Sequence, residues 1–144
     1  MYLYQKGHSP ITSHITIFGK NECDCISISK SDYIYEYEIK ISRADFKKDF
    51  TKIKHTNIIN ENYTKVRKGE TFYLLPNYFN FVTPRDLIKL EEVPDYAGLI
   101  FMDEDGSFEV MRKPKLLHNT KANSLFIRKV AHNLSCKLIF KKIV

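Results

Sequence analysis

The order of secondary-structure patterns along the chain predicts an α/β domain built on a mixed β-sheet. Three observations carry this prediction: strand-like segments fill residues 14–41, a capped helical segment follows at once, and the remaining chain alternates strand and helix patterns. The chain has 144 residues, 43% hydrophobic and 28% charged, which is enough for one domain with its own core. No internal repeat or linker interrupts it, so we expect a single domain over residues 1–144.

Residues 14–18, 23–29 and 33–41 are expected to form three strands joined by short turns into an antiparallel meander. Side chains alternate across a strand, so the third segment, YIYEYEIKI, places both glutamates and the lysine on one face and the tyrosines on the other. We expect the tyrosine face to pack as core. The charged face then either points to water, as in any half-exposed strand, or belongs to a polar site.

A helix is expected directly after the third strand. Ser42 is a suitable N-cap, Asp45 completes an S-x-x-D capping box, and apolar residues recur at helical spacing as far as Ile53. The polar residues from about 56 to 71 that follow are expected to form a loop, with a partly helical or mobile segment as the alternative.

The second half of the chain is expected to hold three more strands and two helices. The expected elements are a strand at 79–83, a short helix from Pro84 to about Leu90, a hairpin of strands 97–102 and 107–111 around the turn DEDG, and a long helix at 121–141. The expected buried face of the long helix consists of Leu125, Val130, Ala131, Leu134 and Leu138.

Charge is distributed unevenly along the chain, which carries a formal net charge of +6. No acidic residue follows Glu109, whereas nine Lys and Arg residues do. This asymmetry favours contact with a polyanion such as DNA, or else a solvated basic helix face.

The apolar runs are too short to cross a bilayer, and the first residues lack the apolar stretch of a signal peptide. The three cysteines, Cys23, Cys25 and Cys136, are an odd and sparse set, which is typical of a reducing compartment. We therefore expect a cytoplasmic protein without a membrane partner. Cys23 and Cys25 point to opposite faces of a strand and have no second pair, so zinc is not expected.

The charged face of the third strand has a possible partner on the second. Pairing of these strands could bring the carboxylate of Asp24 close to Glu38, and Lys40 lies on the same face as Glu38. Two carboxylates that converge need a cation between them, and Mg²⁺ prefers oxygen ligands. An adjacent ammonium group could orient a water molecule or stabilise a phosphate oxygen. This pattern indicates a site for metal-assisted hydrolysis of a phosphodiester.

The arrangement Asp24…Glu38-x-Lys40 resembles the PD-(D/E)xK motif of restriction-endonuclease-like nucleases. The segments EIKISRADFKKDFTKIKH, PNYFNFVTP and VPDYAGLIFMDEDG, in this order, resemble the MmcB-like family of predicted DNA-repair proteins. The resemblance covers about residues 24–115. It implies a restriction-endonuclease-like mixed β-sheet flanked by helices, and a Mg²⁺- or Mn²⁺-dependent nuclease that acts on DNA.

Carried over to this sequence, the resemblance makes Asp24, Glu38 and Lys40 catalytic, with Asp24, Glu38 and the carbonyl of Ile39 as metal ligands. Lys40 would position the attacking water and stabilise charge on the phosphate. The residues expected to contact DNA lie on the following helix and in the polar loop: Ser42, Arg43, Lys52, His55, Lys65, Arg67 and Lys68.

Two features depart from the family pattern. Residues 1–21 are too few, and too rich in β-branched residues, for the usual first helix, so this helix is expected to be missing or shortened. Cys23 stands where the motif has proline. Three hypotheses therefore stay open: a nuclease of the DNA repair or recombination type, a DNA-binding module that does not cut, and a subunit that binds another protein. Nucleases of this fold often pair, so a homodimer is possible, and the Lys-, Ile- and Asn-rich composition suits a bacterial or phage genome.

Overall fold

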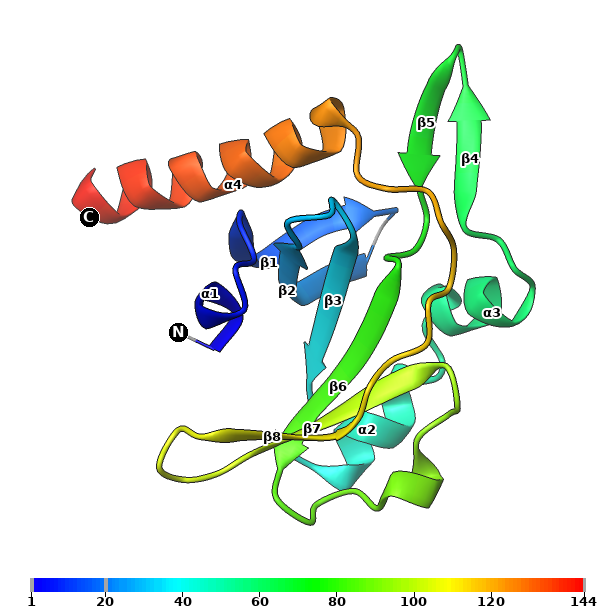
Figure 1. Cartoon of the computed structure of the whole chain (residues 1–144), viewed down its shortest axis with the longest axis vertical. Helices are drawn as coiled ribbons and strands as arrows, with labels where there is room; N and C mark the ends of the chain where they lie inside the picture. Colours follow the sequence, from blue (N-terminus) through cyan, green and yellow to red (C-terminus); the bar gives the residue numbers. More distant parts are fainter. Residues whose placement is uncertain (1, 20, 144) are drawn as a thin grey trace.

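The computed structural model describes residues 2–19 and 21–143 and confirms an α/β fold with a mixed sheet (Figure 1). Six strands form this sheet in the order β1-β2-β3-β6-β7-β8. Their bounds are β1 Ile11–Phe18, β2 Asn21–Ile28, β3 Ile34–Ile39, β6 Tyr78–Pro84, β7 Ala97–Met102 and β8 Phe108–Arg112. The expected meander is present, because β1, β2 and β3 pair antiparallel, whereas β3, β6 and β7 pair parallel and β8 closes the edge antiparallel.

The other elements are four helices, a short 3-10 helix and a separate hairpin. They are α1 Tyr2–Gln5, α2 Arg43–Asp49, α3 Ile53–Ile59, η1 Leu90–Glu92, α4 Ser124–Ile143, and the two-stranded sheet of β4 Thr64–Arg67 and β5 Glu70–Tyr73. The first of these, α1, has four residues. None of the helices in the described ranges is both long and apolar enough to span a bilayer.

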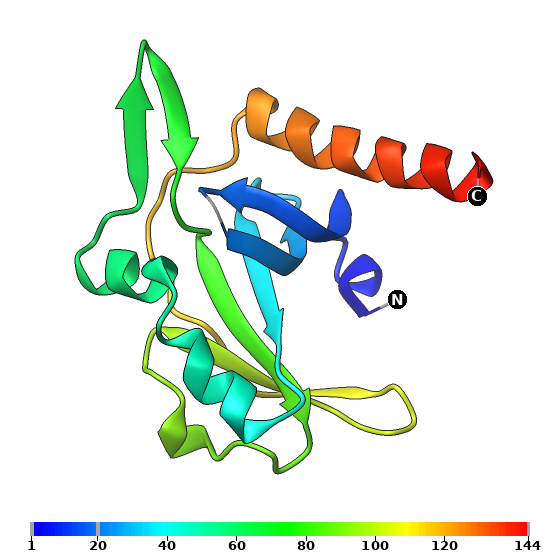
Figure 2. The same ribbon diagram turned by 180° about the vertical axis from the view of Figure 1, so that it is seen from behind.

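Helices α2, α3 and α4 lie on the same face of the sheet (Figures 1 and 2). Phe126 and Val130 of α4 join a core cluster over β1, β2 and the start of β3. Phe46 of α2 joins a second cluster with Phe79 and Phe81 of β6. Between these two apolar clusters, α3 covers the middle of the sheet with polar side chains.

The faces of β3 are the reverse of the expectation. Glu36, Glu38 and Lys40 are buried, with 1–3% of each residue exposed, because they point toward α2 and α3. On the opposite face Tyr37 is buried but Ile39 is 43% exposed, since only α1 and the β8 edge approach that side. The expected core on the tyrosine face is limited to the cluster of Tyr37, Val82 and Ile100, and the charged face is the more deeply buried side of β3.

Other boundaries differ for local reasons. The cap is confirmed, since Ser42 Oγ accepts a hydrogen bond from the Asp45 amide at 3.1 Å, but α2 ends at Asp49 and Ile53 opens α3 with its side chain 56% exposed. Residues 56–71 are not a loop, because they hold most of α3, all of β4 and part of β5. In place of the expected helix from Pro84 to Leu90, β6 ends at Pro84, residues 85–88 form a turn and a bend, and the 3-10 helix η1 begins at Leu90.

Helix α4 is present but buries a different stripe. Of the five expected residues, Val130 is buried and Leu134 is partly buried, whereas Leu125, Ala131 and Leu138 are exposed. Phe126, four residues before Val130, is buried instead. The buried Ala122, just before the helix begins, fixes which side of α4 faces the core, because Phe126 and Val130 follow it at intervals of four residues and so lie on the same side.

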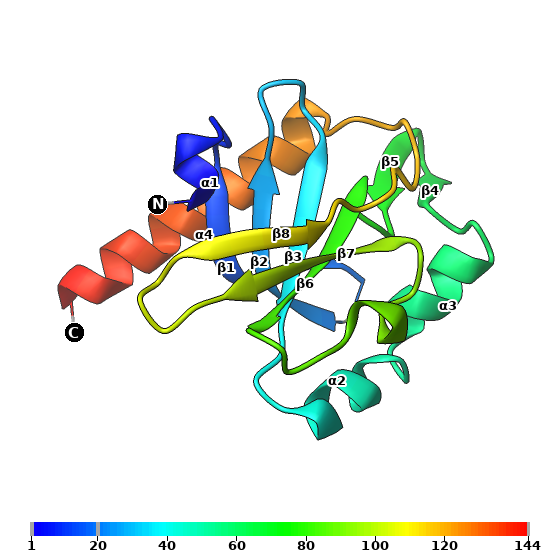
Figure 3. The same cartoon turned by 60° about the horizontal axis from the view of Figure 1, so that its bottom comes forward.

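The segment between β8 and α4 runs back across the molecule and is fixed by a buried asparagine (Figure 3). Asn77 Oδ1 accepts a hydrogen bond from the Ile34 amide at 2.7 Å, and its Nδ2 donates to the carbonyls of His118 at 2.8 Å and Thr120 at 3.0 Å. This side chain ties the returning segment to the start of β3.

Candidate functional site

A group of charged side chains is buried between β3 and the helices α2 and α3. We call it the acid–lysine cluster; its members are Glu36, Glu38, Lys40, Asp49, Lys52, Lys54 and His55. Charged groups are rarely buried unless they are paired, and here three carboxylates meet three ammonium groups.

Local structure explains how the cluster assembles. Glu36 and Glu38 are two apart on β3 and share a face, with Lys40 directly after the strand. The Ser42 cap starts α2, and Asp49 follows two helical turns later at the end that faces β3. The break between α2 and α3 turns the chain so that Lys52 and Lys54 also point inward.

Glu38 is the centre of the cluster. Its Oε1 accepts hydrogen bonds from Lys40 Nζ at 3.2 Å and Lys52 Nζ at 2.5 Å, and its Oε2 accepts one from Lys54 Nζ at 3.2 Å. One carboxylate thus receives all three ammonium groups. Of these, only Lys52 is partly exposed, with 31% of its side chain in solvent.

Asp49 is fully buried and joins the lysines to His55. Its Oδ2 lies 2.6 Å from His55 Nε2, and His55 Nδ1 lies 2.7 Å from the Tyr96 hydroxyl. Its Oδ1 lies 2.9 Å from Lys40 Nζ and 2.7 Å from Lys52 Nζ, but neither contact has hydrogen-bond geometry. Burial alone would raise the pKa of Asp49, but His55, Lys52 and Lys40 together hold this pKa well below its usual range.

Tyr96 lies at the outer end of this chain of contacts. Burial, with a smaller contribution from the charge of Asp49, raises the pKa of Tyr96 to about 12. The phenol therefore stays protonated at neutral pH and can donate its hydrogen to His55.

Glu36 and Lys54 form the innermost pair of the cluster. They hydrogen-bond directly, and both side chains are buried. Burial raises the pKa of Glu36, and the nearby Lys54 opposes this shift. Burial would lower the pKa of Lys54, but Glu36 and Glu38 raise it overall, so the ammonium stays charged.

Asp24 belongs to β2, and its side chain reaches the end of β3 in a different way from the expectation. The β2–β3 register ends at the pair Cys25–Tyr37, and the Asp24 carboxylate instead accepts a hydrogen bond from the Ile39 amide at 2.8 Å. Among the described residues it forms no ion pair within 4 Å. Burial raises the pKa of Asp24, the hydrogen bond from the Ile39 amide opposes this shift, and the charge of Glu38 adds to it.

The remaining predicted DNA-contact residues are dispersed. Lys52 and His55 belong to the cluster, while Ser42 is occupied as the cap of α2. The Arg43 guanidinium pairs with Glu92 at the surface. The other three lie in the β4–β5 hairpin, away from β3: Lys65, Arg67 and Lys68.

Alternation along β3 placed Glu36 on the same face as Glu38, but three other residues of the site and its surroundings were not assigned a role from sequence: Asp49, Lys54 and Tyr96. The K-x-K spacing before His55 could have indicated Lys54. Nothing in the sequence pointed to Tyr96, which reaches His55 from the connection before β7.

The fit of a divalent cation can be judged from the donor atoms. No three His, Cys, Asp or Glu side chains among residues 2–19 and 21–143 are arranged to hold a metal ion. However, Lys52 Nζ lies between Glu38 Oε1 and Asp49 Oδ1, and the latter is a buried oxygen without a hydrogen bond. Mg²⁺ commonly takes one or two carboxylates and completes its shell with water and phosphate oxygens. These two carboxylates therefore fit Mg²⁺ if the partly exposed Lys52 side chain moves toward solvent.

The chain was compared with known proteins. No family model and no curated protein matches it. One solved structure is similar, a protein of unknown function, SPO1766, from Silicibacter pomeroyi, with a TM-score of 0.68 over 94% of this chain and 80% of the other. The two sequences are 18% identical, so the likeness establishes a shared fold and nothing about activity.

Proposed function

We propose that this protein is a Mg²⁺-dependent nuclease of the restriction-endonuclease-like type that acts on DNA, as the resemblance to the MmcB-like family implies. One observation carries the proposal: Lys40 Nζ lies 3.2 Å from Glu38 Oε1 and 2.9 Å from Asp49 Oδ1, next to the partly exposed Lys52. Two carboxylates and one fixed ammonium group are the parts that metal-assisted phosphodiester hydrolysis needs.

Each residue has a distinct role in this proposal. Glu38 and Asp49 would hold the cation, and Asp24, adjacent through Ile39, would complete the acidic end of β3. The bound metal would activate water and polarise the phosphate. Lys40 stabilises negative charge that develops on the phosphate, from a position that its contacts with Glu38 and Asp49 already fix.

Access to the cluster depends on Lys52. Glu38 is 2% exposed and Asp49 is 1% exposed, so neither meets solvent while the Lys52 ammonium covers them. Movement of the Lys52 side chain toward solvent would open Glu38 and Asp49 to a cation, which would supply the positive charge that Lys52 provides here, and would free this lysine to contact DNA.

Cleavage assays with matched variants test the proposal. Single- and double-stranded DNA is incubated with Mg²⁺ or Mn²⁺ and wild type, Glu38→Gln, Lys40→Met or Glu36→Gln. Glu36→Gln is the matched control, because Glu36 lies two residues earlier on the same face of β3, is equally buried and also pairs with a lysine. We expect Glu38→Gln and Lys40→Met to lose about 100-fold or more in rate, while Glu36→Gln keeps the wild-type rate.

Thermal unfolding of each variant by circular dichroism separates lost chemistry from lost structure. Metal-dependent cutting that survives both Glu38→Gln and Lys40→Met rejects the assigned site. Failure of folded wild type to cut any DNA with either metal rejects the nuclease.

A DNA-binding module that does not cut is the second candidate, and the charge balance of the cluster favours it. Three lysines already neutralise the three buried carboxylates, so the cluster is complete without a metal. This candidate is expected to give salt-sensitive DNA binding with no cleavage.

A further inference from the structure

A second surface lies away from the acid–lysine cluster, where the β4–β5 hairpin projects beyond the main sheet toward the start of α4 (Figures 1 and 2). A pocket of about 240 Å³ opens between the hairpin, the end of β1 and the first turns of α4. Its described lining is Ile17, Gly19, Lys65, Arg67, Thr71, Phe72, Tyr73, Leu74, Asn123, Leu125, Phe126 and Lys129. We call this feature the hairpin groove.

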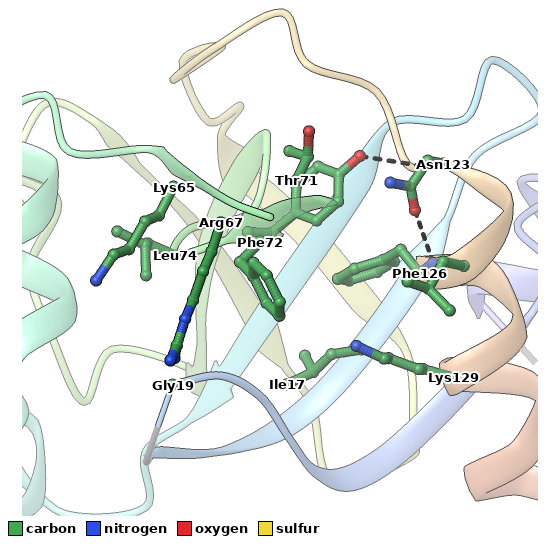
Figure 4. A pocket seen from close by; sticks show the side chains of 12 residues that line it. Ile17, Gly19, Lys65, Arg67, Thr71, Phe72, Leu74, Asn123, Phe126 and Lys129 are labelled. Atoms are coloured by element: carbon green, nitrogen blue, oxygen red, sulfur yellow. Dashed lines mark hydrogen bonds between the residues drawn. The ribbon is translucent and has the colours of Figure 1, made fainter. Parts of the chain in front are cut away.

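The hairpin groove is basic and aromatic. Lys65, Arg67 and Lys129 supply three positive charges, and none of the twelve described lining residues is acidic. Phe72 is 38% exposed, and Lys129 Nζ lies 5.7 Å from the centre of its ring. Figure 4 shows Phe72 between Arg67 on the hairpin side and Phe126 and Lys129 on the α4 side.

Strand pairing explains why these groups share one surface. Lys65 is directly opposite Phe72 in the β4–β5 register, and Arg67 is two residues beyond Lys65, so all three side chains lie on one face of the hairpin. The exposed Phe72 ring is not part of the core cluster, in which the buried Tyr73 and Phe126 pack edge to face.

Hydrogen bonds hold the two walls of the groove together. The Tyr73 hydroxyl donates to the Lys121 carbonyl at 2.5 Å and accepts from the Asn123 amide at 3.0 Å. Asn123 Oδ1 in turn accepts from the Phe126 amide at 2.8 Å, in the first turn of α4 (Figure 4). The distance between hairpin and helix is therefore set before any ligand binds.

We propose that the hairpin groove binds a single-stranded polynucleotide. Proteins that bind single strands combine cations along the phosphate backbone with aromatic rings on which unpaired bases stack. Here Arg67, Lys65 and Lys129 neutralise phosphates, and the exposed ring of Phe72 stacks on a base. The bases of a duplex are already stacked and cannot reach Phe72. The proposal deepens the proposed function by naming the form of nucleic acid, and it can be tested without cleavage.

Glu70 provides a second, independent variant. It is directly opposite Arg67 in the hairpin and exposed, but it does not line the groove and forms no ion pair within 4 Å among the described residues. Its negative charge opposes phosphate binding at this face. Removal of the charge by Glu70→Gln is therefore expected to strengthen binding.

The test is fluorescence anisotropy with labelled 20-nucleotide single-stranded DNA, single-stranded RNA of the same sequence, and the DNA duplex. EDTA is present throughout, so that no metal-dependent cutting occurs. We expect at least one single strand to bind more tightly than the duplex, and the DNA and RNA arms show which polynucleotide is preferred. Phe72→Ala is expected to weaken single-strand binding roughly 5- to 150-fold, the range for loss of one stacked base.

Charge variants distinguish binding in the hairpin groove from nonspecific electrostatic attraction between the basic protein and the nucleic acid. Arg67→Gln is expected to reduce the slope of log Kd against log salt by about 0.7, the value for one single-strand phosphate contact. Lys6→Gln is the control, since it removes one exposed positive charge that lies beside Tyr35 and Tyr78 on the opposite face of the sheet. Phe72 and Arg67 are outside the core clusters, and unfolding midpoints confirm that the variants fold.

Three results overturn the proposal: equal affinity for single strand and duplex, no effect of Phe72→Ala, or an effect of Lys6→Gln as large as that of Arg67→Gln. Failure of the nuclease is distinguishable from failure of the groove. Single-strand binding that depends on Phe72 without any cutting retains the groove and rejects the nuclease. Metal-dependent cutting, together with single-strand binding that Phe72→Ala leaves unchanged, retains the nuclease and rejects the groove.

Discussion

The Lys54→Met variant removes a buried ammonium group and leaves an unbranched apolar side chain in its place. Lys54 is 5% exposed and bonds to Glu36, which is 1% exposed, and to Glu38. The substitution leaves the Glu36 carboxylate buried without a cation. Loss of one partner from a buried pair typically costs about 3–5 kcal/mol. At about 2–4 °C per kcal/mol for a domain near this size, the melting temperature should fall by roughly 6–20 °C.

The sign of the pH dependence follows from Glu36. Burial already raises the pKa of this carboxyl, and loss of Lys54 removes the charge that opposes the shift. A raised folded-state pKa means that stability is lost as pH rises from the unfolded pKa, about 4.3, through the folded one. The deficit of Lys54→Met should therefore be smaller at pH 5 than at pH 8, because Glu36 takes up a proton.

Urea unfolding followed by circular dichroism at both pH values measures the effect. Lys47→Met is the control, because Lys47 is an exposed lysine of α2 with no acidic partner within 4 Å among the described residues. Adding Glu36→Gln to Lys54→Met should recover much of the loss at pH 8. A cost below about 1 kcal/mol at pH 8, or a deficit that grows on acidification, would refute this account of the cluster.

Three further predictions concern stability. Asp49→Asn should destabilise the protein at pH 7. The lowered pKa of Asp49 in the folded state contributes stability at pH values above the unfolded-state pKa, and this stability disappears as pH falls, so the difference from wild type should narrow below about pH 4. Urea unfolding midpoints of both proteins across pH 2–7 check this. Ser42→Ala should cost about 1 kcal/mol through loss of the cap on α2 while Ser42→Asp keeps it, as thermal melts of the two variants will show. Asn77→Leu should cost about 1–3 kcal/mol, because it leaves the Ile34 amide and the carbonyls of the returning segment without partners; hydrogen exchange should then increase first at Ile34.

The sequence predicted the main sheet well because its strands carry clear local signals. Alternation marked β1, β2 and β3, and the DEDG turn marked the β7–β8 hairpin. The β4–β5 hairpin was missed because its ten residues are mostly polar and exposed, so they lack the apolar alternation of a strand packed on a core. Its turn signal, Lys68-Gly69 with positive φ at both residues, was present in the sequence but was read as part of a loop.

The candidate site was predictable in part. Alternation placed Glu36, Glu38 and Lys40 on one face, but it could not show that this face is buried. Burial depends on Lys54 and His55, which arrive from α3 and neutralise or hydrogen-bond the acidic groups. Three lysines converge on the Glu38 carboxylate only in the folded structure, so residue spacing along β3 could not predict this arrangement.

Strand β3 joins the two halves of the sheet, and this position has a consequence for the order in which the protein folds. Its pairing with β2 closes a turn of a few residues, whereas its pairing with β6 brings Tyr35 beside Tyr78 and must enclose α2, α3 and the β4–β5 hairpin. Contacts that close long loops form late, because the chain loses the entropy of loop closure before the contacts stabilise it. The N-terminal meander should therefore exist first with its acidic side chains still hydrated, and dehydration of these charges becomes a late step of folding. During synthesis on the ribosome, Glu36 and Glu38 of β3 would thus stay in contact with water until the segment that carries Lys52 and Lys54 has been made.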